Sequence, residues 1–322
     1  MKKIFLCLLL VLGPGIVYAN DWSPSKPVKI IIPAPPGSLH DSGFKSIQPI
    51  IEKTTGAKFI IEYKPGAAGL IATKYFLDLP ADDHTLLAAT SISHVMSVIT
   101  HPQVVSWNPL DDFQFVSGML TGTLVIANRY NHSINTPEKF LQHLKSADIK
   151  NPVSIGVTFP NQEVAIYHII EFLGLDPKIV KFIKYNDPSK LLVDVVRGDV
   201  EYWIGAIPPT VSLYRSKEIQ YIGSLSDRPL DFLPNVPLMK DHVPGLTQLS
   251  TVGILMHKGS NPAAVKWFNE QISKAVRSDE TKKIRYQGLV SIDEESLTVD
   301  GFRNLMRKSF DNLSPGYRKI YK

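Results

Sequence analysis

Short runs of apolar, mostly β-branched residues alternate with longer amphipathic stretches through most of the chain. This alternation is typical of βα units rather than of a sandwich or a helical bundle. Several of the runs are apolar throughout, as strands buried on both faces of a parallel sheet are. The predicted strands are Val28–Ile32, Phe59–Glu62, Leu86–Ala89, Val153–Val157, Val180–Lys184, Val200–Ile204 and Ile219–Gly223.

The amphipathic stretches between these strands predict helices. Three of them begin with a polar side chain followed by proline, at Thr136-Pro137, Asp187-Pro188 and Asn261-Pro262. The side-chain oxygen accepts a hydrogen bond from an otherwise unpaired amide, and proline occupies the first helical position, where no N–H is needed. The predicted helices are Asp41–Lys53, Leu70–Leu79, Pro137–Lys145, Glu163–Leu173, Pro188–Val196 and Pro262–Val276.

Two further strand signals predict that the chain crosses between two lobes. The run Thr123–Ala127 leads into the polar segment Asn128–Asn131, and the run Val252–Met256 follows Pro244-Gly245. A length of 322 residues also exceeds that of most single domains. We therefore expect an α/β protein of two lobes joined by a hinge, with a ligand cleft between them.

The N-terminus has the pattern of a secretory signal peptide. Lys2 and Lys3 precede the apolar run Ile4–Leu12, and a small residue, Ala19, stands at the expected cleavage site. The apolar run is too short to span a bilayer. We therefore expect a signal peptide over residues 1–19 and a mature protein in the periplasm.

Composition excludes several classes of partner and site. The only cysteine, Cys7, lies in the signal peptide, so the mature chain has neither a disulfide nor a cysteine metal site. Loss of Lys2 and Lys3 lowers the formal net charge from +5 to +3, too little to suggest a nucleic-acid partner. The histidines do not have the spacing of a zinc site, and no phosphate-binding glycine loop is present, so we expect no metal and no cofactor.

Two turns carry the chemistry. The strand ending at Ile32 runs through a proline-rich loop, residues 33–37, into a helix start near Asp41, and the next strand runs through Lys64–Gly69 into another helix. Proline stiffens such turns, and small side chains let an anion approach the backbone. Unpaired amides at helix starts favour a carboxylate or a phosphate. Each turn alone is also compatible with a plain strand-to-helix connection, and Lys64 either adds a charge or is a solvated surface residue.

The two turns resemble those of the receptors of tripartite tricarboxylate transporters, the Bug family of periplasmic solute-binding proteins. Other segments that resemble the family follow in the same order: Asp82–Leu87, Pro109–Phe113, Tyr185 with Asp194, Gly198–Glu201, Leu233–Pro237 and Val243–Gly245. The resemblance implies a two-lobed, type II-like periplasmic binding protein, in which each lobe is a mostly parallel sheet flanked by helices. It places the lobes at residues 20–125 plus 245–322 and at residues 126–244.

The resemblance also implies the function and the site residues. Such a receptor is not an enzyme; it is a monomer that captures a small carboxylate-bearing molecule between its lobes for membrane transporter subunits. Backbone amides, hydroxyls and ordered water hold the carboxylate. By position, the implied ligand-binding residues are Ala34, Pro36, Gly37, Ser38, Asp41, Gly66, Ala67, Ala68, Gly69, Thr90 and Ser91 in the first lobe and Thr158, Asn161 and Asp187 in the second.

This chain departs from the family pattern at several places, among them Ala72, where glycine is usual, and Tyr63-Lys64, where asparagine-arginine is usual. Ser38-Leu39-His40 stands where the family usually has two glycines followed by threonine or serine, so we expect Leu39 to narrow the pocket. Asp187 stands where glycine is common. Facing the cleft, Asp187 would repel a second carboxylate and attract an ammonium group, whereas as the cap of the helix at Pro188 it would be structural.

Two other classes of function stay open. A secreted hydrolase would use His40 with Asp41 or Ser91, which requires a histidine, a carboxylate and a hydroxyl within hydrogen-bond reach of one another in the cleft. A sensor or partner-binding protein would use the same fold for signalling.

Overall fold

The computed structural model describes residues 22–288 and 290–320, so the predicted signal peptide, residues 1–19, lies outside the described residues. Seven strands occur where the apolar runs predict them, and their ends lie within two residues of the prediction. They are β1 (Val28–Ile32), β2 (Phe59–Tyr63), β3 (Thr85–Thr90), β5 (Val153–Val157), β6 (Val180–Lys184), β7 (Tyr202–Ala206) and β8 (Ile219–Ser224).

The six predicted helices are confirmed, with ends within three residues of the prediction. Thr136, Asp187 and Asn261 cap their helices through side-chain oxygens, as the sequence predicts. The six are α1 (Leu39–Thr55), α2 (Leu70–Leu77), α4 (Pro137–Ser146), α5 (Pro160–Leu173), α6 (Pro188–Arg197) and α8 (Pro262–Arg277). Sequence reasoning did not predict α3 (Ser97–Thr100), α7 (Val211–Arg215), α9 (Asp279–Gly288) and α10 (Val299–Ile320). In the described ranges, a helix with the length and apolar character to cross a membrane does not occur.

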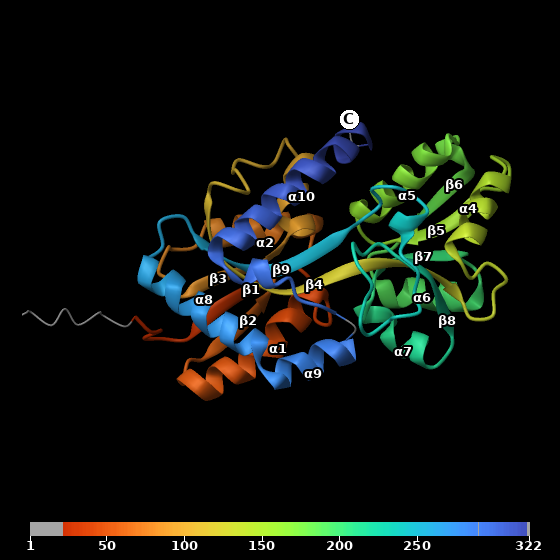
Figure 1. Cartoon of the computed structure of the whole chain (residues 1–322). Coiled ribbons are helices and arrows are strands. Elements are labelled where there is room, and N and C mark those ends of the chain that lie inside the picture. Colours follow the sequence, from red (N-terminus) through yellow and green to blue (C-terminus); the bar gives the residue numbers. More distant parts are fainter. Residues whose placement is uncertain (1–21, 289, 321–322) are drawn as a thin grey trace, which may run out of the picture.

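Nine strands of the described chain form one sheet that runs through both lobes (Figure 1). Its order is β2-β1-β3-β9-β4-β7-β5-β6, and β8 pairs with β4 as well. β1 is parallel to β2 and β3, and β5 is parallel to β6 and β7, whereas β4 (Phe113–Arg129) and β9 (Leu249–His257) run antiparallel to their neighbours. The sheet of each lobe is therefore mixed. In the first lobe β9 runs antiparallel to β3, and in the second lobe β4 runs antiparallel to β7, whereas three strands of each lobe are parallel to one another.

Strand β4 changes partners along its length. Residues 113–123 pair with β9, and residues 124–127 pair with β7. Of its seventeen residues the sequence predicted only Thr123–Ala127. Glycines and hydroxyl residues interrupt the apolar pattern before that point, and Gly118 is one of them because a Cβ there would lie 2.3 Å from Ser296 Oγ.

Each lobe buries its own core on both faces of the sheet. In the first lobe α1 and α8 pack through Phe44 and Phe268 on one face, and α2 and α10 pack through Phe76 and Phe302 on the other. All four rings are at most 1% exposed, and burying each contributes roughly 2–3 kcal/mol. In the second lobe α4 and α5 cover one face and α6 covers the other.

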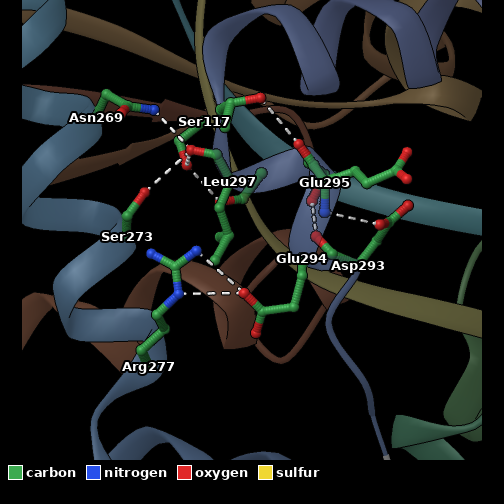
Figure 2. Close-up of polar contacts among 11 residues, drawn as sticks. Ser117, Asn269, Ser273, Arg277, Asp293, Glu294, Glu295 and Leu297 are labelled. Atoms are coloured by element: carbon green, nitrogen blue, oxygen red, sulfur yellow. Dashed lines mark hydrogen bonds and ion pairs between the residues drawn. The ribbon is translucent and has the colours of Figure 1, made fainter.

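The short helix η6 (Glu294–Leu297), which leads into α10, is held on the first lobe by hydrogen bonds to one carbonyl group (Figure 2). The carbonyl oxygen of Leu297 accepts a hydrogen bond from Ser117 Oγ of β4 at 3.2 Å. It also accepts from Asn269 Nδ2 and Ser273 Oγ of α8, at 2.7 and 3.0 Å. The three donors satisfy this carbonyl in the lobe interior and fix where α10 begins.

Gly253 of β9 lies so close to α10 that a side chain is excluded. A Cβ there would lie 2.2 Å from Phe302 Cζ and 2.5 Å from the Ser117 carbonyl oxygen. We expect Gly253→Ala to lower the free energy of unfolding by about 1–3 kcal/mol, since a buried ring and a strand backbone must shift. Urea denaturation followed by circular dichroism measures the loss. Gly288→Ala is the matched control, because the nearest atom lies 4.0 Å from its Cβ position; equal midpoints for the two variants would contradict the packing described.

Candidate ligand-binding site

The ends of three neighbouring strands, β1, β2 and β3, meet at one edge of the first lobe. Ligands of open α/β sheets bind outside the carboxyl ends of such strands. The strands lead into α1, into the short helix η1 (Ala67–Gly69) and into the π-helix η2 (Ser91–Met96). His40 Nε2 of α1 lies 3.0 Å from Ser93 Oγ of η2, and a Cβ at Gly69 would lie 2.8 Å from the Ser93 carbonyl oxygen. The three first-lobe segments predicted from the sequence therefore contact one another.

Asp41 organises the turn after β1. Its carboxylate accepts hydrogen bonds from the Gly37 amide at 2.8 Å and from the Tyr63 hydroxyl at 2.6 Å, and Lys45 Nζ lies 3.0 Å away. The side chain is only 3% exposed. Asp41 therefore fixes the loop and ties it to the end of β2. The Gly37 amide is therefore already paired within the protein.

The first amides of α1 remain unpaired. Ser38 caps the helix by accepting from the Asp41 amide, and the amides of Leu39 and His40 have no hydrogen-bond partner among the main-chain and side-chain groups that the structure describes. Ala34 is buried, whereas Pro36 and Gly37 are exposed at the outside of the loop. Burial lowers the pKa of His40 to about 4, so its imidazole is neutral at pH 7. The start of α1 thus offers two N–H groups beside a neutral histidine.

The turn after β2 has an unusual backbone. Four successive residues have positive φ: Gly66 (129°), Ala67 (46°), Ala68 (52°) and Gly69 (98°). Left-handed backbone at two alanines costs about 1–3 kcal/mol each and concentrates at functional sites. Successive amides in such a turn form a concavity that suits an anion. Within the described chain the amides of Gly66, Ala67 and Ala68 have no hydrogen-bond partner.

Lys64 does not offer a free charge to this turn. Its Nζ lies 3.0 Å from Glu62 and 4.2 Å from the centre of the Tyr75 ring. Of the two readings left open by the sequence, a cation for the ligand or a surface lysine, the contacts favour a structural surface residue.

Of the two hydroxyl residues expected after β3, the structure describes the side chain of Thr90. Thr90 Oγ1 accepts from the Ser93 amide at 2.9 Å and so caps η2, and its own amide donates to Ser93 Oγ at 3.2 Å. The side chain of Ser91 lies outside what the structure describes. Ser93, which the sequence reasoning missed, is the hydroxyl that joins His40 to this segment.

The second-lobe residues of the predicted site are engaged inside the protein. The Thr158 and Phe159 amides both donate to Gln162 Oε1, at 2.6 and 3.2 Å. Asp187 accepts from the Ser189 amide at 2.8 Å, so it has the capping role that the sequence allowed. Sequence reasoning missed Gln162, although a glutamine three residues after a helix cap is a known capping signal.

The starts of α1 and α5 both lie close to the crossing strands. A Cβ at Gly122 of β4 would lie 3.1 Å from Leu39 of α1, and Gly122 pairs with Ser250. Gln248, which directly precedes β9 and stands two residues before Ser250, donates through Nε2 to the carbonyl oxygen of Asn161 in α5 at 3.2 Å. Two residues of strand span about 7 Å, so the two helix starts flank one short stretch of the hinge.

The geometry does not assemble a hydrolase. The partners of Asp41 are Gly37, Tyr63 and Lys45, whereas His40 contacts Ser93, so the histidine and the carboxylate do not act on one another. Among the described residues, three or more side chains suited to hold a metal ion do not come together.

The buried Asp41 carboxylate makes stability depend on pH. Burial opposes its ionised form, but the hydrogen bonds from Tyr63, Gly37 and Lys45 outweigh burial and lower the pKa of Asp41. Its stabilisation is therefore complete above its ordinary pKa of about 3.9 and is lost as the pH falls below that value.

We expect Asp41→Asn to lower the free energy of unfolding by about 1–3 kcal/mol at pH 7 and to reduce the loss of stability between pH 4 and pH 2. Urea denaturation across this pH range measures both effects. Asp279→Asn is the control, since its side chain is 98% exposed. An Asp41→Asn variant with the pH profile of the unaltered protein would contradict the role of this carboxylate.

Comparison with known proteins agrees with this arrangement. Residues 44–295 match the family model described as tripartite tricarboxylate transporter family receptor. The protein BugT of Bordetella pertussis is 22% identical over 280 residues, which cover 84% of this chain and 85% of BugT. Among solved structures, MatC from Rhodopseudomonas palustris with bound malate has a TM-score of 0.78 at 17% identity, covering 93% of this chain and 100% of MatC. A second R. palustris protein, with adipate, also has a TM-score of 0.78 at 17% identity, covering 92% and 97%.

These structures share the fold of this chain, and the match to the family model extends over most of its length. The chain therefore belongs to the tripartite tricarboxylate transporter receptor family, whose members are periplasmic solute-binding receptors and not enzymes.

Proposed function

We propose that this receptor binds a small carboxylate-bearing molecule between its lobes and delivers it to the membrane subunits of a tripartite tricarboxylate-type transporter. The observation that carries the proposal is the left-handed turn at Ala67 and Ala68. Among the described groups, three amides of this turn and two amides at the start of α1 have no hydrogen-bond partner. Strain of this kind persists where a function requires it. A signal peptide over residues 1–19 would bring the chain to the periplasm, where the family acts.

The proposed carboxylate site is made of main chain rather than of charged side chains. The amides of Leu39 and His40 and those of Gly66, Ala67 and Ala68 would surround the carboxylate, with the partial positive charge of the α1 start behind it. Asp41 and Ser38 act indirectly, by fixing the first turn. Gly69 acts indirectly as well, because its lack of a side chain lets the second turn pack on Ser93.

Closure would follow from the hinge. The lobes that we propose, residues 20–125 plus 245–322 and residues 126–244, are joined by β4 and β9. Because the starts of α1 and α5 flank these strands, bending of the strands would bring Thr158 and Asp187 toward a ligand held by the first lobe. A ligand favours the closed arrangement only through contacts that the open one lacks.

A pair of near-isosteric variants tests the carboxylate site. Ala67 is exposed, and asparagine and aspartate tolerate left-handed backbone better than most residues. We expect Ala67→Asp to weaken carboxylate binding by about tenfold or more, since a like charge close to the ligand costs of the order of 1–3 kcal/mol, and we expect Ala67→Asn to bind within about threefold of the unaltered protein.

Isothermal titration calorimetry with a panel of organic acids and amino acids measures the affinities, and added salt should narrow the gap between the two variants. Equal affinities in both variants would exclude the turn as the carboxylate site. Failure of every carboxylate to bind the folded, unaltered protein would exclude the proposed function itself.

A further inference from the structure

We infer that the ligand of this receptor is a monocarboxylate with an apolar body: the first lobe holds the carboxylate, and the second lobe closes on the apolar end through Phe159. This inference rests on the proposed function and names the class of ligand that the same cleft would take. It depends on three features of the second-lobe edge, namely its donors, its charge and its exposed apolar surface.

Two amides at the start of α5 are already used by the protein itself. Gln162 Oε1 accepts from the Thr158 and Phe159 amides, and Gln162 Nε2 donates to Thr158 Oγ1 at 3.2 Å. The oxygen of this side chain occupies the position at the helix start that a ligand oxygen would otherwise take. Asn161 is 4% exposed and faces Gln248 of the hinge, 3.4 Å from its Oε1. A second carboxylate would therefore find the Thr158 and Phe159 amides already occupied.

The charges nearby also disfavour a second carboxylate. Asp187 is exposed at the end of the loop after β6, and its carboxylate lies at the start of α6. Lys184, at the end of β6, is paired with Glu163 at 2.8 Å. A dianionic ligand would bring its far carboxylate toward Asp187 without gaining a free cation from Lys184, and like charges in a closing cleft repel one another.

Two large apolar side chains stand exposed at the two carboxyl edges. Phe159, between β5 and α5, is 42% exposed, and Ile71, in the first turn of α2, is 51% exposed. A Cβ at Gly66 would lie 2.5 Å from Ile71 Cδ1, so the isoleucine covers the turn whose amides are unpaired. Leu39, which is half-buried, lies against Gly122 of the hinge and adds a third apolar side chain. An apolar ligand body would bury these side chains on closure, whereas a charged end would lose its hydration there.

Matched series of ligands that differ only at the far end test the inference. Hexanoate, adipate and 6-aminohexanoate end in a methyl group, a carboxylate and an ammonium group; butanoate, succinate and 4-aminobutanoate repeat the series at a shorter length. 4-Methylbenzoate, terephthalate and 4-(aminomethyl)benzoate repeat it with a ring. Calorimetric titration uses the mature protein after unfolding and refolding, which removes any molecule carried through purification.

We expect the apolar member of the best-binding series to bind at least about tenfold more tightly than its dianionic and zwitterionic partners, as one buried side chain is worth that much. A dicarboxylate that binds as tightly as its apolar partner would overturn the inference and leave the proposed function standing. An amino acid that binds most tightly would also overturn it and would assign the far end to Asp187. If no member of any series binds, the proposed function fails together with the inference.

Variants of Phe159 separate its role from stability. Phe159→Ala should weaken binding of the apolar ligand about tenfold, and Phe159→Lys should raise the affinity for the dicarboxylate relative to the monocarboxylate. Phe172→Ala is the matched control, because Phe172 lies at the other end of α5 and is 49% exposed. Equal effects of Phe159→Ala and Phe172→Ala, or no change of preference in Phe159→Lys, would exclude Phe159 as the residue that selects the ligand.

Discussion

The antiparallel pairing of β4 with β9 is the constraint on which the rest of the molecule depends. Both strands contribute to the sheet at the junction of the lobes, so the position of one lobe relative to the other is set by main-chain hydrogen bonds rather than by a flexible linker. Leu39 packs on Gly122 of this pair, and Asn161 contacts Gln248, which directly precedes β9. The starts of α1 and α5 are therefore both positioned by the same short stretch of the chain.

Local chemistry made much of the fold predictable, and tertiary contacts account for most of what was missed. Helices such as α6 begin where a capping side chain is followed by proline, and this pattern fixes the first residue of the helix. The apolar runs of β1 and β5 match their strands residue for residue. The first part of β4 was not predicted because glycines such as Gly118 interrupt its apolar pattern. A glycine is required there by the close contact with Ser296, which is distant in the sequence. The same holds for Asp41, whose position at a helix start is visible in the sequence but whose bond to Tyr63 depends on the pairing of β1 with β2.

The family resemblance pointed to segments of the candidate site rather than to the contacts of single residues. It pointed to both first-lobe turns, which the structure brings together. It could not indicate that Gly37 is bound to Asp41, or that Gln162 occupies the second-lobe amides, because each depends on which side chain reaches a given N–H. The cations near the site behave alike: Lys45, Lys64 and Lys184 each pair with a carboxylate of the protein. Under the proposed function, recognition of an anion here would therefore depend on peptide groups.

The left-handed turn from Gly66 to Gly69 has a consequence for how such a receptor changes over evolutionary time. Every residue except proline has a peptide N–H, whatever its side chain. Most substitutions in this turn would therefore leave the proposed carboxylate-binding groups in place. The side chains around it, among them Ile71 and Phe159, are free to vary without loss of that group. A receptor built in this way can change its ligand specificity through substitutions of the surrounding side chains. Binding of a carboxylate by the main chain would be retained.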